Sequence, residues 1–192
     1  MPAARRSPRI IAGEAGGRRL AVPPGDKIRP TSDRVKESVF AALGPDRLAG
    51  ARVLDLYAGT GALGLEALSR GAAEALFVER DAAAARAIRS NIETLGFGDR
   101  AVVRAAAVAA VLAGPAPSDG YDLVLLDPPY DTPPADVEAV LHWLVGGDWM
   151  AAAATVVVER PGGSAGLRWP AGWGSTWDRC YGDTLVLFAQ RK

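Results

Sequence analysis

From residue 51 onward, apolar segments that suit β-strands alternate with segments that suit α-helices. The near-continuous apolar runs at 51–57 and 121–127 are typical of strands in a parallel sheet that helices cover on both faces. Two further strands, 175–180 and 184–189, end the pattern. This order predicts an α/β fold with a doubly wound, mostly parallel sheet of seven strands, whose ligand lies at the carboxyl ends of the first strands. The other expected strands are 75–79, 101–104 and 155–159, and the expected helices are 62–69, 81–95, 106–112 and 135–145.

A short segment with different features precedes this alternation. Residues 9–12 and 18–22 suit two short strands around Gly16 and Gly17, so a hairpin is expected. Thr31 or Ser32 is the expected N-cap of a helix that follows. We therefore predict a small N-terminal hairpin and helix appendage, with a basic arm and hairpin over residues 1–30 and the main domain over residues 31–192.

The charge of the chain is unevenly distributed. Its 192 residues include 22 basic and 22 acidic side chains, so the formal net charge is zero. Residues 1–36, however, hold nine basic and three acidic side chains, which leaves the rest of the chain with an acidic surplus. Basic arms of this kind often contact nucleic acid, and a solvated tail is the alternative interpretation.

The sequence also excludes several classes of site. A single cysteine, Cys180, excludes an internal disulfide framework, and with a single histidine, His142, it excludes zinc sites built from several such ligands. No metal is expected. No apolar run approaches the roughly 18 residues of a membrane helix, and the N-terminus lacks the apolar core of a secretory signal. We therefore expect a soluble, cytoplasmic protein without membrane contact.

Five residues outside these patterns receive structural interpretations. Cys180 is expected to be a small buried residue of a terminal strand. His142 is expected to have a surface or packing role, because it is far from every motif. Trp169, Trp173 and Trp177 are expected to pack the last hairpin, with stacking on RNA as the alternative.

The first chemical motif is a glycine-rich loop after the strand at 51–57. Gly59, Gly61 and Gly64 form G-x-G-x-x-G at the start of a helix, and Glu79 ends the next strand. Taken alone, this pattern suits a dinucleotide. Asp55 favours a different ligand, S-adenosylmethionine (AdoMet). A carboxylate at this position would repel the anionic pyrophosphate of a dinucleotide, whereas it would attract the ammonium and sulfonium groups of AdoMet.

The second motif is Asp127-Pro128-Pro129-Tyr130, which ends the strand at 121–127. Two prolines fix the backbone and remove two N–H donors, so the loop offers carbonyl groups, a carboxylate and an aromatic ring. Such a pocket suits a flat base with an amino group. Asp127 and the Pro128 carbonyl can accept from that amino group and direct its nitrogen at a methyl donor, while Tyr130 stacks on the base.

Together these motifs resemble a class I AdoMet-dependent amino-methyltransferase. The segments 9–13, 17–20, 29–40 and 64–72 narrow the resemblance to the RsmD family, which methylates the exocyclic N2 of one guanine in bacterial 16S ribosomal RNA. The resemblance covers about residues 8–190. It implies that the protein is an RNA methyltransferase that uses AdoMet and acts, as a monomer, on 16S ribosomal RNA in an assembling small subunit.

The resemblance also implies roles for individual residues. The expected catalytic residues are Asp127, Pro128, Pro129 and Tyr130. The expected AdoMet-binding residues are Asp55, Tyr57, Ala58, Gly59, Thr60, Gly61, Glu79, Arg80, Thr31 and Arg34. The expected RNA-binding residues are Arg18, Arg19, Arg29, Arg34 and Lys36. Many related enzymes place an acid after the third strand for the adenine amino group; here that stretch is alanine-rich, so adenine recognition is expected to use backbone groups.

Several alternatives stay open at this point. An acid suits the two adjacent donors of guanine, but Asp-Pro-Pro-Tyr also occurs in adenine-N6 methyltransferases. Glutamine-N5 methyltransferases usually have Asn where Asp127 stands. An NAD-linked oxidoreductase would share the glycine loop, and a non-catalytic RNA-binding module could keep a vestigial cofactor site.

Overall fold

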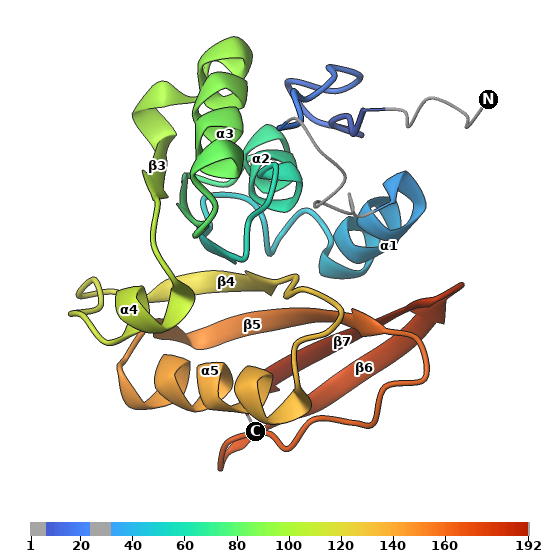
Figure 1. Ribbon diagram of the computed structural model, residues 1–192, viewed down its shortest axis with the longest axis vertical. Helices are drawn as coiled ribbons and strands as arrows, with labels where there is room; N and C mark the ends of the chain where they lie inside the picture. The colour runs from blue at the N-terminus through green and yellow to red at the C-terminus, as the bar shows by residue number, and fades with distance from the viewer. Residues whose placement is uncertain (1–6, 24–31, 192) are drawn as a thin grey trace.

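A computed structural model describes residues 7–23 and 32–191 of the chain. Within these residues, five helices and a short 3-10 turn alternate with seven strands in the expected order (Figure 1). The strands are β1 (Arg52–Leu56), β2 (Glu74–Val78), β3 (Ala101–Arg104), β4 (Tyr121–Leu126), β5 (Met150–Pro161), β6 (Trp173–Tyr181) and β7 (Thr184–Arg191). The helices are α1 (Asp33–Leu43), α2 (Ala62–Ser69), α3 (Ala82–Leu95), α4 (Val108–Leu112) and α5 (Pro134–Gly146), and the 3-10 turn η1 is Gly98–Arg100.

All seven strands form one sheet in the order β3-β2-β1-β4-β5-β7-β6. The first five strands are parallel, and β7 runs antiparallel to both of its neighbours. The chain proceeds outward from β1 through β2 to β3 and then returns to place β4 on the other side of β1. The loops after β1 and β4 therefore diverge, which opens a crevice at their carboxyl ends. The predicted doubly wound, mostly parallel sheet is confirmed.

Helices cover both faces of the sheet. Figure 1 shows α1, α2 and α3 on one side and α4 and α5 on the other. The core on the first side joins apolar side chains of these three helices to residues such as Val53 and Phe77 of the sheet. The core on the second side joins α4 and α5 to the alternate residues, such as Leu54 and Val78. Because neighbouring strand residues point to opposite faces, this division assigns a face to each strand residue.

The helix ends follow local signals in the sequence. Ser32 is the N-cap of α1 and accepts a hydrogen bond from the Val35 N–H at 3.2 Å. Asp81 caps α3 in the same way, and Gly96 ends that helix in a left-handed conformation. The N-cap of α2 is Gly61, which has no side chain, so this helix needs another acceptor for its first turn.

The N-terminal segment 7–23 packs on the core that α1, α2 and α3 share. Ile10, Ala15 and Leu20 are buried there. The expected hairpin is present, but it is short: it has one antiparallel bridge, between Arg9 and Arg19, and backbone hydrogen bonds that join Pro8 and Ile10 to residues 17–20. The predicted boundary at residue 30 lies outside the described residues and stays a prediction.

Buried side chains of α2 and α3 hold this segment. The Glu66 carboxylate accepts from the Ile11 and Ala12 N–H groups at 2.7 and 3.1 Å. Asn91 exchanges two hydrogen bonds with the backbone of Ala21 and donates a third to the Thr60 carbonyl at 3.1 Å. Asn91 thus joins the N-terminal segment directly to the glycine-rich loop.

The segment around β6, at one edge of the sheet, shows one correct and one wrong prediction. Trp173 is buried, and Trp169 and Trp177 pack against the two cores, which agrees with a packing role for all three. Cys180, in contrast, is exposed. It lies on β6, one of the two edge strands of the sheet, and most residues of β6 are not buried, so its position in a strand did not imply burial. Among the described residues, no helix is long and apolar enough to span a bilayer.

Candidate active site

A cleft of about 1240 Å³ opens at the carboxyl edge of the sheet. It lies at the carboxyl ends of the first strands, as predicted, and at the point where the strand order reverses. Most of the predicted catalytic and cofactor-binding residues line it: Asp55, Tyr57, Ala58, Gly59, Thr60, Glu79, Arg80, Asp127, Pro128, Pro129 and Tyr130. Gly61 is the left-handed N-cap of α2, just behind the lining. Arg34 is exposed on α1, and Thr31 and Arg29 fall outside the described residues.

The glycine-rich loop forms the floor of the cleft. Gly59 and Gly61 have φ values of 57° and 78°, in the left-handed region that glycine tolerates best. Gly64 meets a different constraint. A Cβ atom at that position would lie 2.4 Å from Phe77 Cε1 and 2.9 Å from Asp55 Oδ2. The third glycine of the motif therefore lets α2 approach the sheet closely.

Asp55 supplies the acceptor that the first turn of α2 lacks. Its Oδ2 atom accepts from the Gly64 N–H at 2.9 Å, and the residue is 1% exposed. Burial raises the pKa of Asp55 to about 8; the Gly64 hydrogen bond opposes this rise, while repulsion from Asp127 and Glu79 adds to it. A buried acid under this repulsion is stabilised in its charged form by a cation. The position therefore fits the predicted counter-charge for a cationic cofactor.

Glu79 holds the start of the glycine-rich loop. One oxygen of its carboxylate accepts from the Gly59 N–H at 2.9 Å, and the other accepts from the Asp81 N–H at 2.7 Å. Each carboxylate oxygen has two lone pairs, so both can accept a further hydrogen bond. Glu79 can therefore hold a ribose hydroxyl while it keeps the loop in place.

The Asp-Pro-Pro-Tyr loop is anchored at several points along its length. The Asp127 N–H donates to the Leu56 carbonyl at 3.4 Å, which extends the ladder between β1 and β4 by one residue. The Thr132 N–H donates to the Pro129 carbonyl at 2.9 Å and closes a turn. The Tyr130 hydroxyl lies 2.8 Å from Thr184 Oγ1, and the buried Arg160 guanidinium donates to the Thr132 carbonyl at 2.9 Å. The rigidity predicted from two prolines thus has tertiary support.

The described lining of the cleft is strongly acidic. It includes seven acidic side chains and a single basic one, Arg80. The acidic residues are Asp55, Glu79, Asp81, Asp127, Asp131, Asp136 and Glu159. A dinucleotide with two phosphates would be repelled by this surplus, whereas a ligand with an ammonium and a sulfonium would be attracted. The acidic lining therefore fits AdoMet better than NAD.

The region next to the third strand has no acidic side chain of its own. Ala106, Ala107, Val108 and Ala109 line the cleft there. The neighbouring helix α5 contributes Trp143 to the same lining, a residue that is 45% exposed. Trp143 was not predicted to line a site, because it lies in an ordinary helix, away from each motif along the chain.

Glu159 was likewise not among the site residues predicted from the sequence. It ends the apolar part of β5 in the way that Glu79 ends β2, so the rule that selected one acid could have selected the other. The structure places Glu159 in the same cleft as Asp127, with 8% of its surface exposed.

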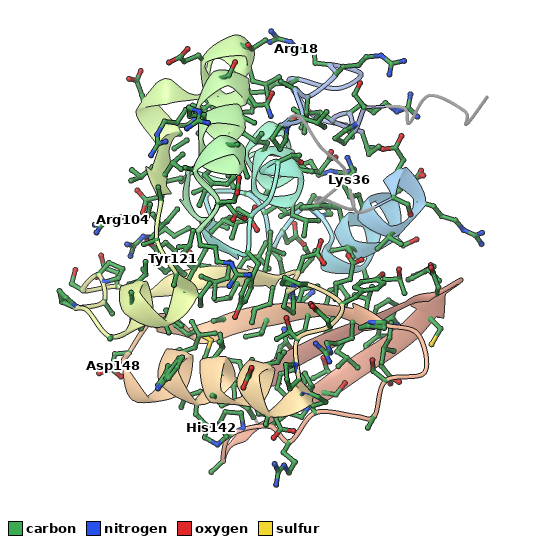
Figure 2. All side chains as sticks on the ribbon, viewed as in Figure 1. Arg18, Lys36, Arg104, Tyr121, His142 and Asp148 are labelled. Atoms are coloured by element: carbon green, nitrogen blue, oxygen red, sulfur yellow. The ribbon has the colours of Figure 1, made fainter. Side chains whose placement is uncertain are left out.

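The residues predicted to bind RNA fall into two groups. Arg18, Arg19 and Arg34 are exposed, and Figure 2 shows Arg18 at the outer surface of the molecule. Lys36 requires a correction. Its side chain is fully buried, donates to the Arg9 carbonyl and lies 3.6 Å from Asp33 Oδ1. Lys36 therefore joins the N-terminal segment to α1 and does not offer its charge to a phosphate group.

His142 and possible metal ligands are the remaining sequence predictions. His142 is exposed on α5, with Nδ1 2.8 Å from the Glu138 carbonyl (Figure 2). Within residues 7–23 and 32–191, no three side chains of the His, Cys, Asp or Glu type are grouped so that they could hold a metal ion.

Comparisons with known proteins agree with this geometry. A family model described as "Conserved hypothetical protein 95" matches residues 8–190. Ribosomal RNA small subunit methyltransferase D of Escherichia coli is 35% identical over 184 residues, which cover 96% of this chain and 90% of that protein. The protein of the same name from Haemophilus influenzae is 37% identical over 159 residues, which cover 82% of this chain and 81% of that protein.

A solved structure from Escherichia coli, assigned as a methyltransferase, has the same fold. It matches with a TM-score of 0.85 and 36% identity, and the match covers 96% of this chain and 97% of that one. The similarity thus extends over nearly the whole chain, including the cleft and the segment that packs beside it. The chain belongs to the ribosomal RNA small subunit methyltransferase D (RsmD) family and has the class I methyltransferase fold.

Proposed function

We propose that this protein transfers a methyl group from AdoMet to the exocyclic N2 of a guanine in 16S ribosomal RNA. The observation that carries the proposal is the presence of Asp127 and the Pro128 carbonyl in one cleft with Asp55 and Glu79. The first pair suits an amino-bearing base and the second pair suits a cationic nucleoside. The names of the relatives, which are ribosomal RNA methyltransferases, support the same substrate class.

When bound, AdoMet supplies an electrophilic methyl group on a sulfonium. Asp55 stabilises positive charge near the glycine-rich loop, and Glu79 accepts from the ribose. Asp127 and the Pro128 carbonyl accept from the N2 hydrogens and direct the nitrogen lone pair toward the methyl group. Asp127 also stabilises the positive charge that develops on N2, and the extra proton then passes to solvent.

We further propose that the substrate is RNA in an assembling small subunit and that the protein acts in the cytoplasm as a monomer. A monomer suffices because one chain supplies every residue of the described lining. The exposed Arg18, Arg19 and Arg34, together with Arg29, are the proposed RNA contacts. Comparing methylation rates on naked 16S RNA and on isolated small subunits tests which form is the substrate.

The central test is to map modified bases in 16S RNA from cells that lack the protein. One N2-methylguanine should disappear and return with the wild-type gene. Asp127→Ala should not restore it, although the purified variant should keep nearly wild-type AdoMet affinity. Asp119→Ala, which removes an exposed acid from the loop before β4, is the matched control and should restore the modification.

Each outcome separates the proposal from its alternatives. Loss of an N6-methyladenine instead would favour an adenine methyltransferase, and loss of a methylated glutamine would favour the protein-directed enzymes. Binding of NAD without AdoMet in calorimetry would favour an oxidoreductase. RNA binding without any methyl transfer by the wild type would favour a non-catalytic module.

A further inference from the structure

Glu159 lies beside Asp127 at the edge of the sheet that carries the cleft. The parallel register of β4 and β5 pairs Leu126 with Val158, and Asp127 and Glu159 are the next residue of each strand. Neighbouring strands are separated by about 4.8 Å, so the two backbones are close. Both side chains line the cleft. The two acids therefore lie on adjacent strands, where both could contact one ligand at this end of the cleft.

The face of the sheet on which Glu159 lies follows from its neighbours. Val157, two residues earlier on β5, belongs to the core beneath α1, α2 and α3, whereas Val158 belongs to the opposite core. Val186, the cross-strand partner of Glu159 on β7, also belongs to the first core. Glu159 therefore shares the face of Val157, which is also the face of Asp55 two strands away.

Glu159 is a buried acid, so its carboxylate needs hydrogen-bond donors around it. The residue is only 8% exposed and lies within a central strand rather than at a surface. An acid in such a place is costly unless donors surround it. A carboxylate can accept about four hydrogen bonds, so such a side chain can hold contacts within the protein and a ligand donor at the same time. The part of Glu159 that is open faces the cleft.

The chemistry of the proposed base provides such a donor. The pairing edge of guanine carries N1–H next to the N2 amino group, and both are donors. Asp127 and the Pro128 carbonyl account for the amino hydrogens, which leaves N1–H for a neighbouring acceptor. Adenine and 2-aminopurine have an unprotonated N1 with a lone pair, which a carboxylate repels.

We propose that Glu159 accepts the N1–H of the target guanine and thereby selects guanine over bases with an unprotonated N1. This inference rests on the proposed function, since it assigns one donor of the proposed substrate to a residue outside the Asp-Pro-Pro-Tyr loop. Glu159 is a specificity residue in this scheme, and Asp127 keeps its role at N2.

The test uses RNA substrates with guanine or 2-aminopurine at the nucleotide that mapping identifies. Both bases carry the N2 amino group, so both can be methylated, but only guanine has N1–H. Methyl transfer from labelled AdoMet is measured for the wild type, Glu159→Gln and Glu74→Gln. Glu74 makes the matched control because it is exposed and lies at the opposite end of β2 from the cleft.

The wild type should strongly prefer guanine. Glu159→Gln should lose about tenfold or more in kcat/KM on guanine, because a charge-assisted hydrogen bond is replaced by a neutral one. The same variant should gain on 2-aminopurine, because the new amide can donate to N1. The ratio of the two rates should therefore fall by at least about tenfold, whereas Glu74→Gln should leave it unchanged.

A role of Glu159 in folding alone would lower both rates equally, and an unchanged ratio would overturn the inference. If Glu159→Gln does not fold, the wild type still decides the question: equal methylation of guanine and 2-aminopurine by the wild type would refute recognition of N1–H. Absence of N2-methylguanine formation by the wild type would instead refute the proposed function itself, so the two failures are distinguishable.

Discussion

The buried acid Asp55 predicts that AdoMet binding becomes tighter as the pH rises from 6 to 8. Burial raises the pKa of Asp55 to about 8, so the carboxyl group is mostly protonated at neutral pH when no cation is bound. A cationic ligand favours the ionised form, and binding must then release the proton. Replacing Asp55 with Asn should remove this coupling and keep an oxygen that can accept from the Gly64 N–H.

The size of the effect follows from that pKa. With a value of about 8, roughly one molecule in ten has an ionised Asp55 at pH 7, and roughly one in a hundred at pH 6. If AdoMet binds only the ionised form, its Kd should fall about ninefold from pH 6 to 7 and about fivefold from pH 7 to 8, then level off. About one proton should be released per molecule bound below pH 7.

The same pKa shift makes the cofactor-free protein less stable as the pH rises. Unfolding returns the pKa of Asp55 from about 8 to its ordinary value of 3.8, so the folded state holds more protons between about pH 4 and pH 8. The contribution of this group to the free energy of unfolding is therefore fully present below that window and is lost as the pH rises through it.

Calorimetric titration at pH 6, 7 and 8, in two buffers that differ in ionisation enthalpy, measures both Kd and the number of protons released. Asp55→Asn is titrated in parallel, since any ionisation of AdoMet itself affects both proteins equally. A wild-type Kd that changes less than about twofold across this range, with no proton release, would refute the role assigned to Asp55. So would an Asp55→Asn variant that keeps the wild-type pH dependence of Kd.

Three further predictions concern the supports of the cleft and the arm. Gly64→Ala should destabilise the fold by about 1–3 kcal/mol, because its Cβ would clash with the buried Phe77 ring; urea unfolding measures the loss. Asn91→Ala should cost about 1–3 kcal/mol and accelerate amide hydrogen exchange at Ala21, whose N–H loses its acceptor. The double charge reversal Arg18→Glu and Arg19→Glu should flatten the salt dependence of RNA affinity by about one to two logarithmic units per decade and leave AdoMet affinity unchanged. An unchanged free energy of unfolding would contradict the first prediction, and unchanged hydrogen exchange at Ala21 would contradict the second. An unchanged salt dependence of RNA affinity would contradict the third.

Much of the site could be predicted from the sequence because parallel strands bring their carboxyl ends to one edge of a sheet. Asp55, Glu79 and Asp127 each belong to a strand with a clear apolar pattern, and the structure places all three in one cleft. Glu159 follows the same rule, but nothing nearby in the sequence marks it as chemical. Only the order of the strands, with β5 beside β4, brings it next to Asp127.

The sequence by itself determined the elements, their order and the glycine-rich loop, because strand and helix periodicity, capping residues and positive φ angles depend on neighbours along the chain. The tertiary structure decided the fate of side chains whose partners are distant in sequence. Lys36 has the charge of an RNA-binding residue, yet the packing of the N-terminal segment on α1 buries it. Cys180 has the apolar character of a core residue, yet β6 lies at the edge of the sheet and leaves it exposed. Burial is a property of what covers a residue, and that covering comes from segments that fold back from elsewhere in the chain.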